Sequence, residues 1–331
     1  MTVNTDHQLM EALQRRAERR TSRRDFFRAG AAVAGGGAAL ALAACDGGDG
    51  PSGDPPFTVP TPTPPNNAVS DADILNFALN LEYLEAQFYS FAALGQGLPA
   101  SSLTGVGTQG AVTGGRQVAF TDPVVRDYAR EIAADEIAHV NFLRTAIGTS
   151  AAAQPAIDIG STATSAFSAA ARAAGLVGAG QAFDPYASDE NFLLGAYIFE
   201  DVGVTAYKGA SPLLTSKTFL EAAAGILAAE AYHAGLIRTV LYAKGLGTPS
   251  LRSSADAISN ARDSLDGATD LDQGISPAND VSNIVPTDAN GLAFSRSTGE
   301  VLNIVYLTPG TVTRGGFFPN GVNGRFTVGG I

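Results

Sequence analysis

The chain has 331 residues, of which 45% are hydrophobic and 16% are charged, and its formal net charge is −11. This length allows one sizeable domain or two small ones. The acidic balance argues against a nucleic-acid partner, because phosphate binding needs clustered Lys and Arg. A single cysteine excludes a framework of intrachain disulfides.

Residues 1–45 have the pattern of an export signal. The segment 21–27, Thr-Ser-Arg-Arg-Asp-Phe-Phe, resembles a twin-arginine motif, and small apolar residues interrupted by glycines follow it. The next segment, Leu-Ala-Ala-Cys at 42–45, resembles a lipoprotein processing box in which the Cys45 thiol is acylated. We expect export by the twin-arginine route to the cell envelope or periplasm, with a lipid anchor in the membrane. The alternative is a plain signal peptide with an incidental cysteine.

Residues 46–68 form a proline-rich linker. Seven prolines lie between positions 51 and 65, and this density disfavours helix and favours an extended, semi-rigid tether.

Four helices are predicted in residues 69–248, because apolar residues recur there at spacings of three and four. They span about 71–94, 121–147, 189–208 and 216–244, with capping residues at their starts and glycine near three of their ends. The turn between the third and fourth helices is short, so these helices are antiparallel neighbours. Residues 149–187, with a short helix at 164–176, are long enough to return along the bundle. The predicted fold is an all-α four-helix bundle with a long crossover between helices 2 and 3.

Residues 249–331 are rich in Asp, Asn, Ser and Gly and are predicted to be an irregular extension, mostly loop. One amphipathic stretch at 298–307 is predicted to be a short helix, and Phe317 and Phe318 are hydrophobic enough to be buried.

An internal repeat places acidic and imidazole side chains at matching positions. Glu precedes Tyr by seven residues in the first and third helices, at Glu82 and Tyr89 and at Glu200 and Tyr207, so each pair shares one helical face. Glu precedes His by three in the second and fourth helices, at Glu136 and His139 and at Glu230 and His233. These are the two histidines that follow the signal, and chance would place a Glu three residues before both of them only about once in a thousand.

Such a set suits a pair of divalent cations, because several carboxylates offset about four positive charges and each ion gains one nitrogen ligand. Apolar residues flank both Glu-x-x-His pairs, and an uncompensated carboxylate buried there costs several kcal/mol. The alternatives are side chains on solvated helix faces and a metal-free, salt-bridged core.

Residues 71–244 resemble the ferritin-like superfamily, in particular the exported ferritin-like and desiccation-related proteins of bacteria. The resemblance implies terminal carboxylates at Glu82 and Glu200, bridging carboxylates at Glu136 and Glu230, and one imidazole per metal from His139 and His233. It further implies groups behind these ligands at Tyr89, Tyr207 and Asp135. Glu85 can replace Glu82 as a ligand, but only Glu82 has a tyrosine seven residues later.

The expected function is that of an exported protein with two Fe or Mn ions that oxidises Fe(II) or consumes O₂ or peroxide in envelope stress protection. The alternative is a non-enzymatic, membrane-tethered structural or binding protein whose metal braces the bundle. A homo-oligomer is compatible with the sequence, whereas a closed storage cage is disfavoured because the tether and the extension obstruct a compact shell.

Overall fold

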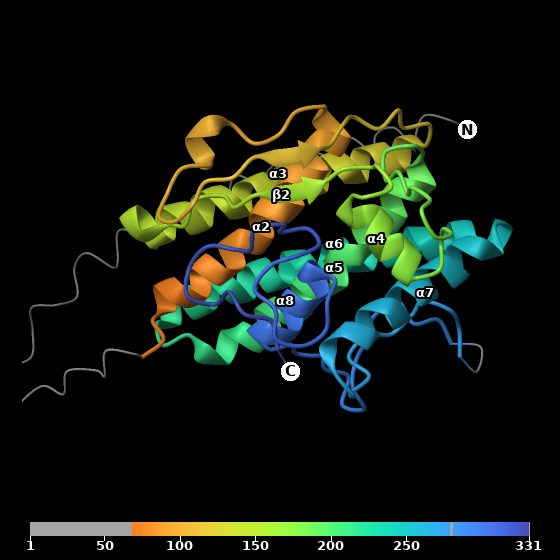
Figure 1. The fold of residues 1–331 in the computed structure, drawn as a ribbon. Helices are drawn as coiled ribbons and strands as arrows, with labels where there is room; N and C mark the ends of the chain where they lie inside the picture. The colour runs from red at the N-terminus through yellow and green to blue at the C-terminus, as the bar shows by residue number, and fades with distance from the viewer. Residues whose placement is uncertain (1–67, 279–280, 331) are drawn as a thin grey trace, which may run out of the picture. The chain divides into compact units, whose positions relative to one another are not determined.

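The computed structural model describes residues 68–278 and 281–330. Four long helices form a bundle: α2 (Asp71–Leu94), α3 (Pro123–Ile147), α5 (Asp189–Ala210) and α6 (Lys217–Gly247). Helix α2 packs on α3 and helix α5 packs on α6, so that two hairpins make up the bundle (Figure 1). The predicted helical bundle with a long crossover is therefore confirmed. The export signal, Cys45 and all of the linker except its last residue lie outside the described residues.

The helix starts follow from local capping. Ser70 and Asp73 form a reciprocal capping box at the start of α2. At the start of α3, the Asp122 carboxylate accepts a hydrogen bond from the Val124 amide, and Pro123 lies between these two residues. The hydroxyls of Ser188 and Ser216 accept hydrogen bonds from amides in the first turns of α5 and α6.

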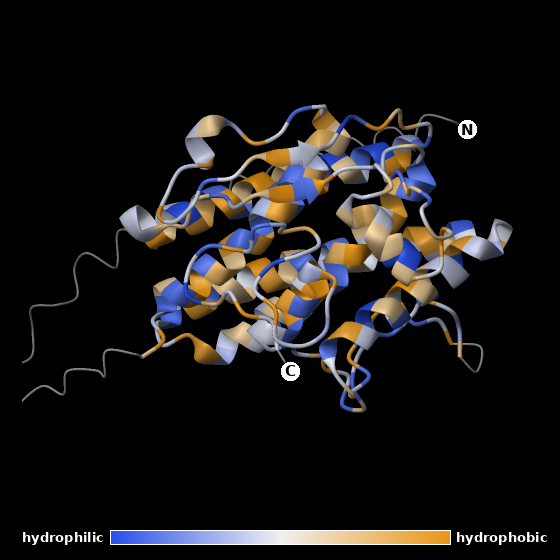
Figure 2. Cartoon of the chain, in the orientation of Figure 1, coloured by the Kyte–Doolittle hydropathy of each residue, from blue (hydrophilic) through white to orange (hydrophobic). Residues whose placement is uncertain are grey.

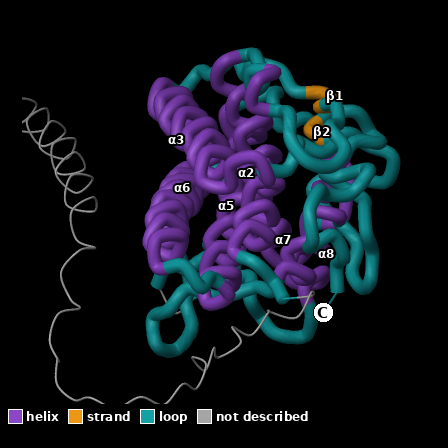
Figure 3. Tube along the Cα trace, turned by 90° about the vertical axis from the view of Figure 1, so that its left-hand side faces the viewer, coloured by secondary structure: helices purple, strands orange, loops and turns teal. Residues whose placement is uncertain are grey.

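The two helices that begin each hairpin are the most deeply buried. Helix α2 buries 19 of its 24 residues, whereas α3 buries 7 of 25. Helices α3 and α6 therefore form an outer side of the bundle (Figure 3). Hydrophilic and hydrophobic residues are mixed along the helices (Figure 2). Carboxylates on α2 and α5 are consequently held away from water. None of the described helices is long and apolar enough to cross a membrane.

The connections pack against the bundle. Strand β1 (Val112–Gly114) in the α2–α3 connection pairs in parallel with β2 (Ile157–Ile159) in the crossover, with Val112 opposite Ile157. The crossover also contains α4 (Ala166–Ala173), as predicted, and short 3₁₀ turns occur at Ala100–Ser102, Gly148–Ser150 and Ser211–Leu213.

The prediction of one short helix in the C-terminal extension is wrong. Helix α8 (Thr298–Tyr306) occurs as expected, but α7 (Pro249–Asp266) is an 18-residue helix where the sequence pattern predicts loop. It begins directly after α6 and packs on α5, α6 and α8. Phe317 is fully buried, with its ring 4.8 Å from that of Phe199 on α5. The extension is thus part of the same hydrophobic core as the bundle.

Buried ion pairs fasten the extension to the bundle. Arg238 of α6 and Arg262 of α7 both donate to Asp201 Oδ2 of α5, at 2.7 and 2.8 Å. Asp272 accepts from Arg262 and from Arg296, and Arg296 also donates to Asp266. Three guanidinium groups and three carboxylates therefore balance one another inside the protein.

Candidate metal centre

The six predicted ligands come together in the interior of the bundle. The carboxylates of Glu82, Glu136, Glu200 and Glu230 are 0–2% exposed, and each comes from a different helix. The two imidazole rings face each other, with centroids 6.2 Å apart. Candidate ligand atoms within 4.8 Å of one another form two groups, one of Glu82, Glu136, His139 and Glu230 and one of Glu200, Glu230 and His233.

Two carboxylates lie between the imidazoles. Glu136 Oε2 is 3.6 Å from His139 Nδ1, while its Oε1 is 3.1 Å from His233 Nδ1. Glu230 Oε1 is 3.6 Å from His139 Nδ1, and Glu230 belongs to both groups of candidate ligands. By contrast, Glu82 contacts His139 at 3.2 Å and Glu200 approaches His233 at 3.8 Å. This geometry suits shared positions for Glu136 and Glu230 and outer positions for Glu82 and Glu200.

The two tyrosines of the repeat exchange hydrogen bonds between the hairpins. The Tyr89 hydroxyl of α2 donates to Glu200 Oε1 of α5, and the Tyr207 hydroxyl of α5 donates to Glu82 Oε1 of α2. Each tyrosine therefore orients the outer carboxylate of the opposite helix, not the one seven residues before it.

Asp135 lies behind one imidazole. Its Oδ2 is 3.2 Å from His233 Nε2, and its side chain is 49% exposed. Position 229, which corresponds to Asp135 in the repeat, is alanine, and His139 has 11% of its side chain exposed compared with 4% for His233. The centre is thus asymmetric in the groups that support its histidines.

Two contributions to the site were missed or underrated from the sequence. Glu85 is 6% exposed and lies beside the cluster as a fifth buried carboxylate, in addition to Glu82 and not in its place. Gly203 provides room for the ligand set, since a Cβ atom there would be 2.4 Å from Glu230 Oε2. A glycine inside a helix, one turn after Glu200, was the available signal.

Burial disfavours the ionised form of the carboxyl groups and so acts to raise their pKa values. Burial, followed by the charge of Glu136, raises the pKa of Glu82 to about 7, and burial raises that of Glu200 to about 8. The same two causes hold the pKa values of Glu85 and Glu230 well above their usual range. Burial also acts to raise the pKa of Glu136, but the close approach of the two imidazoles outweighs burial and lowers it to about 2.

The neighbouring carboxylates raise the pKa values of both imidazoles. Burial alone would lower the pKa of His139, but the Glu82 and Glu136 carboxylates raise it to about 11. Burial is likewise outweighed at His233, where the hydrogen bond with Asp135 and the close approach of Glu136 raise the pKa to about 10. Without other cations, the cluster holds protons at neutral pH that a pair of metal ions would displace.

The donor set fits metal ions. Both oxygens of Glu136 and of Glu230, Glu200 Oε2 and His233 Nδ1 are buried and form no hydrogen bond within residues 68–278 and 281–330. No Lys or Arg in that part of the chain forms an ion pair with the five carboxylates. Buried lone pairs without partners are rare and call for an explanation, and coordination supplies one. Oxygen-rich ligands with one imidazole per ion suit Fe or Mn.

Comparison with known proteins agrees with this geometry. Residues 70–243 match the family model described as a ferritin-like domain. The chain is 30% identical to the "Ferritin-like catalase Nec2" of Nesocodon mauritianus, over 82% of this chain and 89% of that protein. It is also 30% identical to the "Desiccation-related protein PCC13-62" of Craterostigma plantagineum, over 77% and 84% of the two chains. No solved structure matches.

Proposed function

We propose, since the chain belongs to the ferritin-like family, that its buried cluster binds two Fe or Mn ions and uses them to disproportionate peroxide. The observation that carries the proposal is the convergence of four carboxylates and two imidazoles with unsatisfied lone pairs on one buried point. The similarity of the chain to a relative named as a catalase supports the choice of peroxide as substrate. The net reaction converts two molecules of hydrogen peroxide into two of water and one of O₂.

The protein's own residues hold the centre and its protons. When bound, the ions supply the two-electron exchange with peroxide. Glu136 and Glu230 would hold the ions together with the outer carboxylates and the two histidines, and Tyr89 and Tyr207 fix the outer carboxylates through their hydroxyl groups. Glu85 Oε2 is buried and has no hydrogen-bond partner among the described residues, and burial holds the pKa of Glu85 well above its usual range, so this side chain would hold a proton beside the cluster. The surrounding apolar helices exclude water.

The test uses an oxygen electrode and metal-loaded protein. With Mn or Fe bound, added peroxide should release one O₂ for every two peroxide molecules, whereas Fe(II) oxidation would consume O₂. Replacing Glu136 by Gln should abolish the release, and replacing the exposed Glu221 by Gln should leave it unchanged. Metal-loaded protein that releases no O₂ from peroxide would contradict the proposal.

The competing function is a non-enzymatic one, in which the metal only stabilises the bundle. The similarity to a desiccation-related protein favours this alternative. In that case the double substitution His139→Ala and His233→Ala lowers the melting temperature of metal-loaded protein, but no peroxide or O₂ chemistry exists to be lost. Measuring both quantities on the same samples separates the two functions.

We also propose a location for this chemistry in the cell envelope. The support is the twin-arginine pattern and the cysteine of the processing box, Cys45. Replacing Arg23 and Arg24 by Lys should retain the full-length chain in the cytoplasm, and Cys45→Ala should release exported protein from the membrane fraction. Unchanged fractionation of both variants would contradict the proposal.

A further inference from the structure

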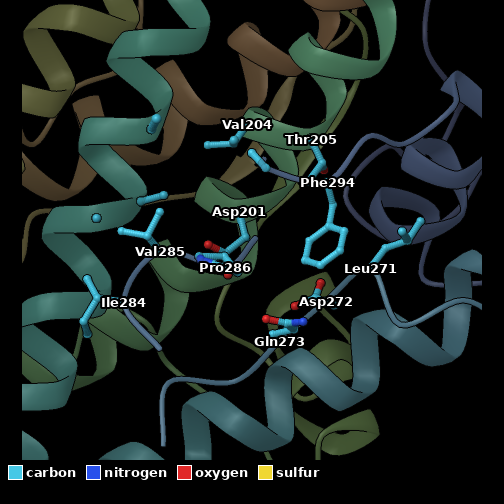
Figure 4. A pocket seen from close by; sticks show the side chains of 14 residues that line it. Asp201, Val204, Thr205, Leu271, Asp272, Gln273, Ile284, Val285, Pro286 and Phe294 are labelled. Carbon is cyan, nitrogen blue, oxygen red and sulfur yellow. The ribbon is translucent and has the colours of Figure 1, made fainter. Parts of the chain in front are cut away.

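A cavity lies outside the metal centre, between helices α5 and α6 and the C-terminal extension. It has a volume of about 80 Å³ and is lined mainly by apolar side chains, including Val204, Leu271 and Phe294. Figure 4 shows the Phe294 ring and the Asp201 carboxylate pointing into this space. A surface groove of about 610 Å³ lies next to the cavity and shares Ile284 and Val285 with its lining.

The cavity and the metal centre occupy neighbouring faces of the same helices. Asp201 directly follows the ligand Glu200, and Ala234 directly follows the ligand His233. Successive residues of an α-helix point about 100° apart, so the helices themselves form a wall between the two sites. A molecule in the cavity is therefore not a substrate of the metal pair.

The polar end of the cavity carries an unused acceptor. Asp201 is 6% exposed, and both of its ion pairs, with Arg238 and Arg262, end on Oδ2. Asp201 Oδ1 accepts no hydrogen bond within the described part of the chain. Gln273, at the same end, accepts from Asn283 through Oε1, while its Nε2 donates no bond there. One acceptor and one donor thus border an otherwise apolar space.

The α6 wall of the cavity contains a glycine although the neighbouring described residues leave room for a larger side chain. A Cβ atom at Gly235 would meet no atom within 4 Å. Glycine inside a helix is less favourable than alanine by about 1 kcal/mol, and no close contact with the described residues explains its presence at this position. Gly235 lines both the cavity and the groove, so it borders the two spaces at once.

We propose that this cavity and groove bind a neutral, linear molecule with an apolar chain and a terminal hydroxyl group. The hydroxyl donates to Asp201 Oδ1 and accepts from Gln273 Nε2, since one O–H group satisfies both atoms. The cavity is about half the roughly 150 Å³ that holds benzene, so it takes the head of the molecule. The chain continues into the groove over Val285 and Tyr232, which are 71% and 75% exposed.

Charge explains why the head is neutral. Asp201 and Asp272, the two carboxylates that line the cavity, belong to a cluster of three guanidinium groups and three carboxylates that already balance, so an ammonium or carboxylate head would bring an uncompensated charge into a mainly apolar space. A primary alcohol brings none.

The test is calorimetric titration of the metal-free, full-length protein with linear alcohols. We expect saturable binding that tightens about fourfold per methylene from 1-butanol to 1-hexanol, as burial of each CH₂ in the groove predicts. Hexylammonium and hexanoate should bind at least tenfold more weakly than 1-hexanol. Absence of saturable binding, as for a cavity that holds only water, or equal binding of the charged analogues would overturn the proposal.

Two matched variants locate the binding. Gly235→Leu places a side chain at the position that borders both cavity and groove and should weaken 1-hexanol binding at least tenfold. Gly225→Leu is the control, because Gly225 lies on the same helix with no atom within 4 Å of its Cβ position and lines neither space. Equal affinity of the two variants would place any binding elsewhere and refute the site. Because the titrations need no metal, their outcome is independent of the proposed peroxide chemistry.

Discussion

Replacing Glu200 by Gln should stabilise the metal-free protein while weakening its hold on metal. Glu200 is fully buried, and its pKa is about 8 against an ordinary value of 4.5. Between those two values the folded protein keeps a proton that the unfolded chain has released, so the stability of the folded state falls as the pH rises. A neutral amide does not titrate, and its oxygen can still accept the hydrogen bond from Tyr89.

The size of the effect follows from the interval between the two pKa values. At about 1.4 kcal/mol per pH unit, the loss from pH 4.5 to pH 7 is about 3 kcal/mol, whereas at pH 5 it is below about 1 kcal/mol. For a domain of this size the gain at pH 7 corresponds to a rise in melting temperature of about 6–12 °C. The pH dependence distinguishes this electrostatic gain from a change in packing, which would be the same at both pH values.

The assay is thermal unfolding with chelator at pH 7 and pH 5, followed by titration with Mn²⁺ at pH 7. We expect Glu200→Gln to melt higher than the parent at pH 7, nearly level with it at pH 5, and to bind Mn²⁺ more weakly. The exposed Glu221→Gln is the control and should change neither property. A variant that melts below the parent at pH 7, or gains equally at both pH values, would refute the reasoning.

Three further outcomes are expected. The metal-free protein should lose thermal stability from pH 5 to pH 9, because folded Glu82 and Glu200 keep their protons up to about pH 7 and 8, whereas the unfolded chain releases them near pH 4.5. Metal-loaded protein should show the opposite trend. Melting curves recorded with and without chelator check both expectations. Tyr89→Phe should lower metal affinity about 10–100-fold in a competition titration with a chelating dye, because it frees a ligand carboxylate. Phe317→Ala should lower the free energy of unfolding in urea by about 3–5 kcal/mol, whereas Phe142→Ala, whose side chain is 45% exposed, should lower it by less than about 1 kcal/mol.

The part of the site that lies on fixed helical spacing could be predicted. A Glu three residues before a His must share its face, and two copies of this pair in one bundle have few places to meet except the core. Helix starts were predictable for the same local reason, since Ser70, Asp122, Ser188 and Ser216 cap the turns that follow them.

Helix α7 could not be predicted by the same means. Its inward positions include Arg262, which is 3% exposed, and a search for periodic apolar residues does not count a buried arginine. The position is tolerated because Asp201 and Asp272, distant in sequence, neutralise it. Glu85 was underrated because the spacing to tyrosine was used to choose between it and Glu82. The spacing of three that joins Glu to His also places Glu85 on the face of Glu82.

The repeat is nearly two-fold, and one of its breaks makes the two proposed metal positions unequal. Asp135 holds His233 through Nε2, but the matching position beside His139 is Ala229. A carboxylate behind an imidazole fixes the ring and increases its basicity, so the position at His233 should bind metal more tightly. Cobalt titration followed by absorbance should therefore show two steps in the parent protein.

Asp135→Ala should weaken the tighter step about 10–100-fold and leave the other unchanged. Ala229→Asp, which places a carboxylate at the matching position, should strengthen the weaker step and bring the two together. If Asp135→Ala instead weakened both steps equally, the hydrogen bond to His233 would act on the bundle as a whole, and the two halves of the repeat would not be independent binding positions.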